Sequence, residues 1–324
     1  MRTHLGVTIC GGEFGQLNMP GTYNRDYIYP NETQMKYYAT KGIRLIQIPF
    51  RWERLQHKMF GELNTADLNL LDNAIEAAAK YNIEIILDMH NYGRYRINNT
   101  DYIIGMPEVP RAAYRDAWKK LANYFKKHDN IYAYVIMAEP NNMGIYTWFP
   151  TAQAAIYGIR EADRNTTIIV DGDGYANAKN WVKYSDDLKH LIDPANNLVY
   201  SAHNYFDDDC SGTYNEVNGK REVNPNIGIE KAKPFINWLK ANNKKGFFGE
   251  FGVPCTDGKW MEAMENFIRY IREENVGAMY WAGGAWWHDY PLAIEPRNGK
   301  DRPQMLVLQK YTKDRNYHLM YAKN

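Results

Sequence analysis

Hydrophobic positions in this chain gather in short β-rich apolar runs, and each run is followed by a longer stretch with the apolar and polar periodicity of a helix. This order is expected of a parallel sheet whose strands are joined by helices, because such strands are buried on both faces. Eight runs are predicted as strands, at residues 6–10, 43–49, 83–90, 133–138, 167–171, 198–204, 246–250 and 276–281. Helices are predicted between them at residues 65–80, 111–127, 150–163, 229–243 and 260–274.

The number of these units predicts the fold class, an α/β protein built as a (β/α)8 TIM barrel. No stretch rich in proline, glycine or serine divides the chain, so we expect a single domain over residues 1–324. A doubly wound dinucleotide-binding sheet is the alternative. It usually has fewer strands, and no G-x-G-x-x-G motif follows the first run of this chain.

The charges nearly cancel, at a formal net charge of +1, and form neither a basic block nor an acidic tail. We therefore expect no nucleic acid and no membrane among the partners, and a neutral substrate. Residues 1–4 lack the apolar run of a signal peptide. The 26 Tyr and 9 Trp suit surfaces that bind a ring with one apolar face and one polar edge.

Polar and aromatic residues close most of the predicted strands. Their position matters because the active site of a TIM barrel lies at the carboxyl ends of its strands. We expect the side chains at these ends to meet on one rim of the barrel. They are Arg51 at strand two, His90 and Asn91 at strand three, Glu139 at strand four, His203 and Tyr205 at strand six, Glu250 at strand seven and Trp281 at strand eight.

Glu139 and Glu250 end apolar strands, where an ionised carboxylate is costly unless it has partners. Glycosidases account for such a pair, since one carboxylic acid protonates the leaving oxygen and a second carboxylate attacks the anomeric carbon or activates water. Glu250 suits the nucleophile, because Arg51 and Tyr205 could hold it ionised. Glu139, with His203 as its neighbour, suits the acid/base.

Each of these residues taken alone has a structural alternative. A glutamate can cap a helix or pair with a cation, the two histidines can be satisfied core residues, Arg51 can tether a carboxylate and Trp281 can fill the barrel. Their coincidence at one end of the strands favours the catalytic interpretation.

Metal catalysis and serine hydrolysis are weaker alternatives. His90 and His203 lie on different strands, no H-E-x-x-H helix occurs, and Cys10, Cys210 and Cys255 have no zinc-type spacing. The G-x-S-x-G motif of a serine hydrolase is also missing. We expect neither a metal nor a cofactor.

Six segments in order resemble glycoside hydrolase family 5, the cellulase family. The resemblance spans nearly the whole chain and is closest to the bacterial and fungal endoglucanase branch, whose sixth loop carries a Ser-Gly-Thr like the one beginning at Ser211. The segments are Ile48-Pro49-Phe50-Arg51-Trp52-Glu53-Arg54-Leu55, Leu87-Asp88-Met89-His90-Asn91-Tyr92, Ile136-Met137-Ala138-Glu139-Pro140, Ala202-His203-Asn204-Tyr205, Gly249-Glu250-Phe251-Gly252 and Tyr280-Trp281.

The resemblance implies double displacement with retention, in which Glu250 forms a glycosyl-enzyme and Glu139 acts first as acid and then as base. The two carboxyl groups should lie about 5 to 5.5 Å apart. His90 and Asn91 would bind sugar hydroxyls, and Trp281 would form the floor of the subsite at the cleavage point. Further candidates for stacking against sugars are Tyr92, Trp148, Trp286 and Trp287.

One position departs from the family pattern. The family has asparagine directly before the acid/base, where it donates a hydrogen bond to the sugar 2-hydroxyl, and this chain has Ala138. Such a bond strengthens in the transition state, so its loss should slow the reaction. An engineered substitution and a natural variant would both explain the alanine, and the otherwise intact pattern favours the first.

The resulting prediction is a retaining endo-β-1,4-glucanase that hydrolyses cellulose or a related β-glucan polysaccharide or oligosaccharide, with transglycosylation as a further activity. The alternatives are a mannan- or xyloglucan-directed hydrolase of the same family and a catalytically impaired carbohydrate-binding protein. We expect a monomer. Because polysaccharides lie outside cells, we also expect a secreted protein, either extracellular or periplasmic.

Overall fold

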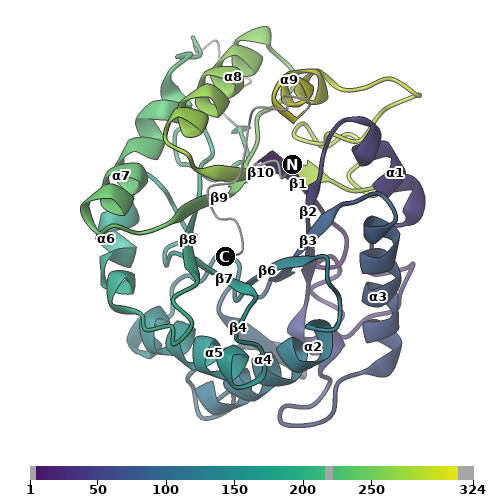
Figure 1. Cartoon of the computed structure of the whole chain (residues 1–324), viewed down its shortest axis with the longest axis vertical. Coiled ribbons are helices and arrows are strands. Elements are labelled where there is room, and N and C mark those ends of the chain that lie inside the picture. The colour runs from purple at the N-terminus through teal and green to yellow at the C-terminus, as the bar shows by residue number, and fades with distance from the viewer. Residues whose placement is uncertain (1–4, 216–221, 313–324) are drawn as a thin grey trace.

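The computed structural model describes residues 5–215 and 222–312. Its centre is a ring of parallel strands in the order β1-β10-β9-β8-β7-β6-β3-β2, which closes into a barrel (Figure 1). The predicted TIM barrel is therefore confirmed. The strands of the barrel are β1 (Leu5–Ile9), β2 (Leu45–Phe50), β3 (Glu84–Met89), β6 (Ile131–Val135), β7 (Thr167–Asp171), β8 (Leu198–His203), β9 (Gly246–Phe251) and β10 (Gly277–Gly283).

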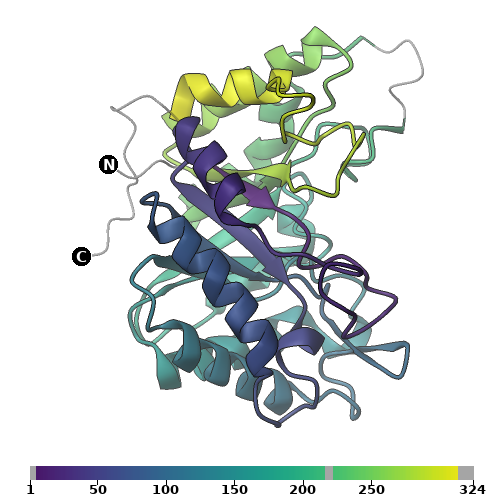
Figure 2. The ribbon, with the colours of Figure 1, turned by 90° about the vertical axis from the view of Figure 1, so that its right-hand side faces the viewer.

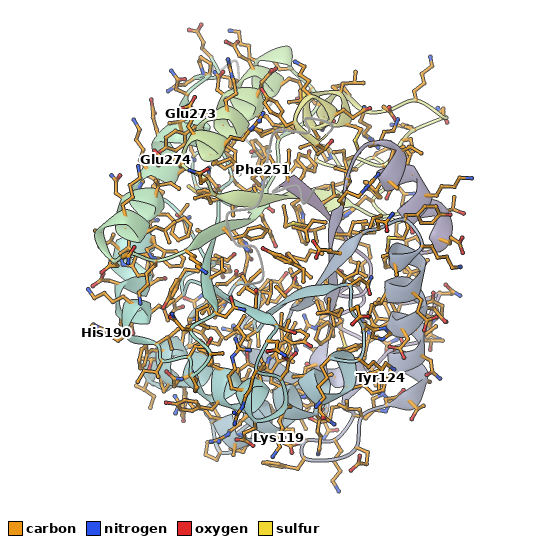
Figure 3. The ribbon with its side chains drawn as sticks, in the orientation of Figure 1. Lys119, Tyr124, His190, Phe251, Glu273 and Glu274 are labelled. Atoms are coloured by element: carbon orange, nitrogen blue, oxygen red, sulfur yellow. The ribbon has the colours of Figure 1, made fainter. Side chains whose placement is uncertain are left out.

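Helices form an outer layer around this barrel (Figures 1 and 2). Figure 3 shows the side chains of Lys119 and Glu273 at the periphery, whereas Phe251 lies on a barrel strand. None of the helices in the described ranges is long and apolar enough to cross a membrane. The helices are α1 (Glu32–Thr40), α2 (Trp52–Leu55), α3 (Thr65–Ala79), α4 (Arg111–Phe125), η1 (Gly144–Tyr146), α5 (Trp148–Ala162), α6 (Trp181–Ser185), η2 (Asp186–His190), α7 (Ile227–Ala241), α8 (Gly258–Glu273) and α9 (Pro303–Thr312).

All eight predicted strands are strands of the barrel, and the five predicted helices are α3, α4, α5, α7 and α8. The largest shift is in strand β6, which ends at Val135 although the apolar run continues to Ala138. The backbone there bends towards the neighbouring strand end, since the Ala138 N–H donates to the Met89 carbonyl oxygen. One domain accounts for the described residues, and the predicted boundaries at 1 and 324 lie outside them.

The sequence did not predict a small antiparallel hairpin after β3, formed by β4 (Arg94–Ile97) and β5 (Thr100–Ile103). Asn98 and Asn99 form its turn with φ angles of 48° and 65°. Asparagine tolerates this left-handed conformation, which two-residue hairpin turns require at both positions. The hairpin is held beside the barrel, because the Arg96 N–H donates to Glu53 Oε1 at 2.7 Å.

The barrel interior changes from apolar to polar along its strands. Alternate residues of a strand face the same side, so Ile86 and Asp88 share one face of β3, and Ile169 and Asp171 share one face of β7. The two isoleucines belong to an apolar cluster inside the barrel, and the two aspartates lie nearer the carboxyl ends of their strands. The interior cluster consists of Leu45, Ile86, Tyr132, Ala133, Val135, Ile169, Val199, Phe247 and Met279.

Candidate active site

Glu139 and Glu250 lie next to each other at the carboxyl end of the barrel, one in the loop after β6 and the other in β9. His203, the last residue of β8, lies between them. Its Nδ1 is 2.7 Å from Glu139 Oε1 and 3.3 Å from Glu250 Oε2. One side-chain N or O atom of each of the three residues lies within 4.8 Å of the others. The structure therefore brings together the two glutamates that the sequence singled out.

Asp171, which the sequence analysis did not single out, completes the environment of His203. Its Oδ2 lies 3.0 Å from His203 Nε2. Burial lowers the pKa of His203, but the carboxylates of Glu250 and Asp171 and the hydrogen bonds to Asp171 and Glu139 raise it well above its ordinary value. We therefore expect both ring nitrogens of His203 to carry protons at neutral pH.

The Glu250 carboxylate is buried and hydrogen-bonded by Tyr205, whose hydroxyl donates to Glu250 Oε2 at 2.6 Å. Burial raises the pKa of Glu250, and the nearby Glu139 raises it further. His203, His90 and the Tyr205 hydrogen bond oppose this increase. Tyr205 thus makes the predicted hydrogen bond to Glu250. The positive charges near Glu250 belong to His203 and His90.

Arg51 does not make the predicted ion pair with Glu250 in the described structure. Its Nη1 donates to the His90 carbonyl oxygen at 2.9 Å, and its Nε lies 3.7 Å from Glu53 Oε2. The physical reason is that helix α2 begins directly after Arg51 and places Glu53 beside the guanidinium. Arg51 therefore supports the loop that carries His90, and its charge is partnered by Glu53.

Asn91 also differs from the expectation that it binds sugar hydroxyls. Its side chain is buried and fully engaged within the protein. Its Oδ1 accepts from the Trp52 N–H at 2.8 Å, and its Nδ2 donates to Glu53 Oε2 at 2.8 Å and to the Arg94 carbonyl oxygen at 3.1 Å. Asn91 therefore joins α2 to the hairpin. The sequence alone does not show whether the side chain of Asn91 points towards a substrate or forms hydrogen bonds within the protein.

His90 lies near enough to Glu250 for that carboxylate to affect its pKa, and it is oriented by the buried carboxylate of Asp88. Its Nδ1 is 2.9 Å from Asp88 Oδ2, its Nε2 is 3.1 Å from the Tyr92 hydroxyl, and its ring stacks on Trp281 at a centroid distance of 5.5 Å. Burial lowers the pKa of His90, but Asp88, Glu250 and Glu13 raise it, to about 9. We therefore expect the His90 ring to be positively charged at neutral pH.

Ala138 is buried directly before Glu139, at the position where the sequence pattern leads one to expect an asparagine. Its backbone is well bonded, since its N–H donates to Met89 and its carbonyl oxygen accepts from the Tyr92 N–H at 3.2 Å. Its methyl group can neither donate nor accept a hydrogen bond. The backbone frame of this strand end is thus held by bonds that do not depend on the side chain.

Aromatic side chains line a cavity of about 510 Å³ whose wall includes Trp281, the residue that stacks on His90. Trp281, Trp287 and Tyr92 contribute to it, and Trp286 stacks near Phe14 at a centroid distance of 6.4 Å. The full lining is Glu13, Phe14, Gly15, Gln16, Leu17, Asn18, Tyr92, Trp281 and Trp287. These rings offer flat apolar faces of the kind that stack against sugars.

Trp148, another predicted stacking residue, is buried at 1% exposure, and its Nε1 donates to the Asp171 carbonyl oxygen at 2.8 Å. That prediction is wrong. The residue begins helix α5, so the helix packs the indole against the strand end below the site.

A metal ion would need at least three histidine, cysteine or acidic side chains whose ligand atoms lie close together. Within the described ranges one such group occurs, and it consists of Glu139, His203 and Glu250. The histidine Nδ1 is already occupied by the two carboxylates. The arrangement therefore suits proton transfer and nucleophilic attack, and the absence of a metal and of a cofactor stays a prediction.

Comparison with known proteins identifies the family. A family model described as Cellulase (glycosyl hydrolase family 5) matches residues 7–286. The chain is 32% identical over 301 residues to endo-beta-1,4-glucanase B of Emericella nidulans, which covers 92% of this chain and 87% of that relative.

Solved structures are similar over nearly the whole chain. Pseudomonas stutzeri endoglucanase Cel5A in complex with cellobiose has 44% sequence identity and a TM-score of 0.90, covering 95% of this chain and 92% of that chain. XacCel5A in complex with cellopentaose has 36% identity and a TM-score of 0.88, covering 96% of this chain and 99% of that chain.

Proposed function

The chain belongs to glycosyl hydrolase family 5, and on this basis we propose that it is a retaining endo-β-1,4-glucanase acting on cellulose or a related β-glucan. The observation that carries the proposal is the close approach of Glu139 and Glu250. One carboxylate oxygen of each glutamate and one ring nitrogen of His203 all lie within 4.8 Å of one another. Retaining glycosidases hold their carboxyl groups about 5 to 5.5 Å apart, whereas inverting enzymes need room for a water molecule.

The reaction then proceeds in two displacements. Glu250 attacks the anomeric carbon, the bond from that carbon to the leaving oxygen breaks, and Glu139 gives its proton to that oxygen. In the second step Glu139 takes a proton from water, the resulting oxygen attacks the anomeric carbon, and the bond to Glu250 breaks. Protons and electrons balance without a cofactor.

Cleavage of a β-1,4-glucan at internal bonds is supported by the names of the relatives and by the bound cellobiose and cellopentaose of the two similar structures. The test is digestion of cellohexaose, mannohexaose and a xyloglucan oligosaccharide, with products separated by chromatography. Cleavage of cellohexaose at internal bonds, without cleavage of the other two substrates, supports the proposal. Faster cleavage of either other substrate would replace the glucan by that polymer, and binding without cleavage would favour a carbohydrate-binding protein.

Ala138 is expected to slow this reaction. We predict that Ala138→Asn raises kcat on cellohexaose by about tenfold or more, because the new amide can donate to the sugar 2-hydroxyl, and tenfold corresponds to about 1.4 kcal/mol of transition-state stabilisation. Steady-state kinetics of both proteins give the answer. Ala138→Leu is the control, since it adds volume without a donor and should give no gain. An unchanged or lower kcat in the asparagine variant would contradict the assigned position of the sugar.

Two further features belong to the proposal. Products longer than cellohexaose in the same digestion would reveal transglycosylation, in which a sugar hydroxyl replaces water at the glycosyl-enzyme. The polymeric substrate lies outside cells, which supports secretion into the extracellular space or the periplasm. We also propose that the chain acts as a monomer. Light scattering of the purified chain tests the oligomeric state.

A further inference from the structure

Asp171 is connected to Glu139 in two ways, directly through the Glu139 backbone N–H and indirectly through His203, and it does not line the aromatic cavity. It is the last residue of β7, and its side chain is buried at 1% exposure. One atom, Oδ2, accepts the backbone N–H of Glu139 at 3.2 Å and lies 3.0 Å from His203 Nε2. Through the other ring nitrogen of His203, the same oxygen is connected to the Glu139 side chain.

The backbone of Glu139 needs such support. Its φ angle is +49°, in the left-handed region that a residue with a side chain rarely adopts. The Asp171 carboxylate holds its N–H, and Asn141 Nδ2 donates to its carbonyl oxygen at 2.9 Å. Both peptide groups beside the acid/base are therefore held by side chains, one from the end of β7 and one from the loop that carries Glu139 itself.

The remaining oxygen of Asp171 makes the residue costly. Oδ1 is buried and has no hydrogen-bond partner among the described residues. A buried acceptor left unpaired destabilises the folded protein. Stability alone therefore does not explain an aspartate at this position, and such groups call for a functional explanation.

We propose, building on the retaining mechanism above, that Asp171 is a positioning residue that keeps His203 as an imidazolium, so that its Nδ1–H can follow the negative charge between the two catalytic glutamates. Before the first displacement the charge is on Glu250, 3.3 Å from Nδ1. In the glycosyl-enzyme Glu250 is an uncharged ester and the charge is on Glu139, 2.7 Å from Nδ1. The His203 Nδ1–H can therefore hydrogen-bond whichever of the two glutamates is charged, without movement of the barrel.

The charges around His203 are consistent with this role. Asp171 faces it from β7, Glu250 from β9 and Glu139 from the loop after β6. Asp88 on β3 is close enough for its own pKa to be affected by His203 and Asp171, and His90 is the other cation near Glu250. Removing the charge of Asp171 should lower the pKa of His203, so the imidazolium should be lost at a lower pH.

The test compares Asp171→Asn with the matched variant Asp173→Asn, two residues further along the chain in the turn after β7. Among the described residues, Asp173 Oδ1 accepts a hydrogen bond only from the Gly174 N–H. For Asp171→Asn on cellohexaose we expect kcat to fall about 10- to 100-fold, KM to change less than about threefold, and the alkaline limb of the pH profile to move about one unit lower. Asp173→Asn should stay within about twofold of the unchanged protein and keep its pH profile.

Nitrogen NMR of histidine-labelled full-length protein provides a second readout, with the His203 signals assigned by their loss in His203→Gln. We expect both ring nitrogens to be protonated at pH 7.5 in the unchanged protein, and to deprotonate at lower pH in Asp171→Asn. A neutral His203 at pH 7.5 would overturn the proposal even if Asp171→Asn did not fold. Identical pH profiles for Asp171→Asn and Asp173→Asn would also overturn the proposal. If Glu250→Gln were inactive in that case, the proposed glycosidase function would still stand.

Discussion

Glu250→Gln is expected to lower kcat on cellohexaose by about 10⁴-fold or more, because an amide cannot form the glycosyl-enzyme. Glutamine has the volume of glutamate and can still accept the Tyr205 hydrogen bond, which is 2.6 Å in the present structure. Burial raises the pKa of Glu250, so removal of its charge should leave the melting temperature unchanged or higher. Release of reducing ends and thermal unfolding measure the two effects.

The control for this variant is Glu262→Gln, on the exposed side of helix α8, which should keep its activity within about twofold. Glu250→Ala with added azide gives a sharper result. Azide can enter the space left by the carboxylate and attack an activated β-cellobioside from that side, which yields an α-glycosyl azide. A loss below tenfold in Glu250→Gln, or a β-azide from Glu250→Ala, would remove Glu250 from the role of nucleophile.

Glu139→Gln is expected to lower kcat on cellohexaose by about 10²- to 10⁴-fold, the usual contribution of a general acid. The release of dinitrophenol from 2,4-dinitrophenyl β-cellobioside should be affected much less in a single turnover, because this leaving group departs without a proton. His203 Nδ1, 2.7 Å from Glu139 Oε1, can hydrogen-bond the amide oxygen, so the variant should fold. Rapid-mixing measurements of both substrates give the ratio.

Azide also separates the roles of the two glutamates. In Glu139→Ala it should react with the glycosyl-enzyme in place of water, without needing a base, and give a β-glycosyl azide with a faster turnover. Glu262→Gln again serves as the control. Equal losses on both substrates, or no acceleration by azide, would show that Glu139 does not transfer the proton.

The sequence was sufficient for the barrel and for the closeness of Glu139 and Glu250, since both depend on patterns that can be recognised without tertiary information. Apolar runs of strand length located every barrel strand, and the glutamates that end two of them lie together because parallel strands end on one rim. The hairpin at residues 94–103 was missed because its two strands have four residues each and contain no apolar run.

Side-chain directions were the part that could not be predicted. Asn91 and Arg51 turn towards Glu53 because helix α2 begins at Trp52, a local feature without a clear sequence signal. Asp171 did carry a signal: like Glu139 it is a carboxylate that closes an apolar strand run, and the same reasoning would have singled it out. Its contact with His203 depends on the register of β7 and β8, which only the structure supplies.

The most direct test of the retaining mechanism is proton NMR of the unchanged chain acting on cellohexaose, with spectra collected before the product anomers equilibrate. Attack by Glu250 followed by attack of water at the same carbon should release new reducing ends first as the β-anomer, with the α-anomer appearing later by mutarotation. Initial release of the α-anomer would mean a single displacement by water. The assignment of Glu250 as nucleophile would then be wrong.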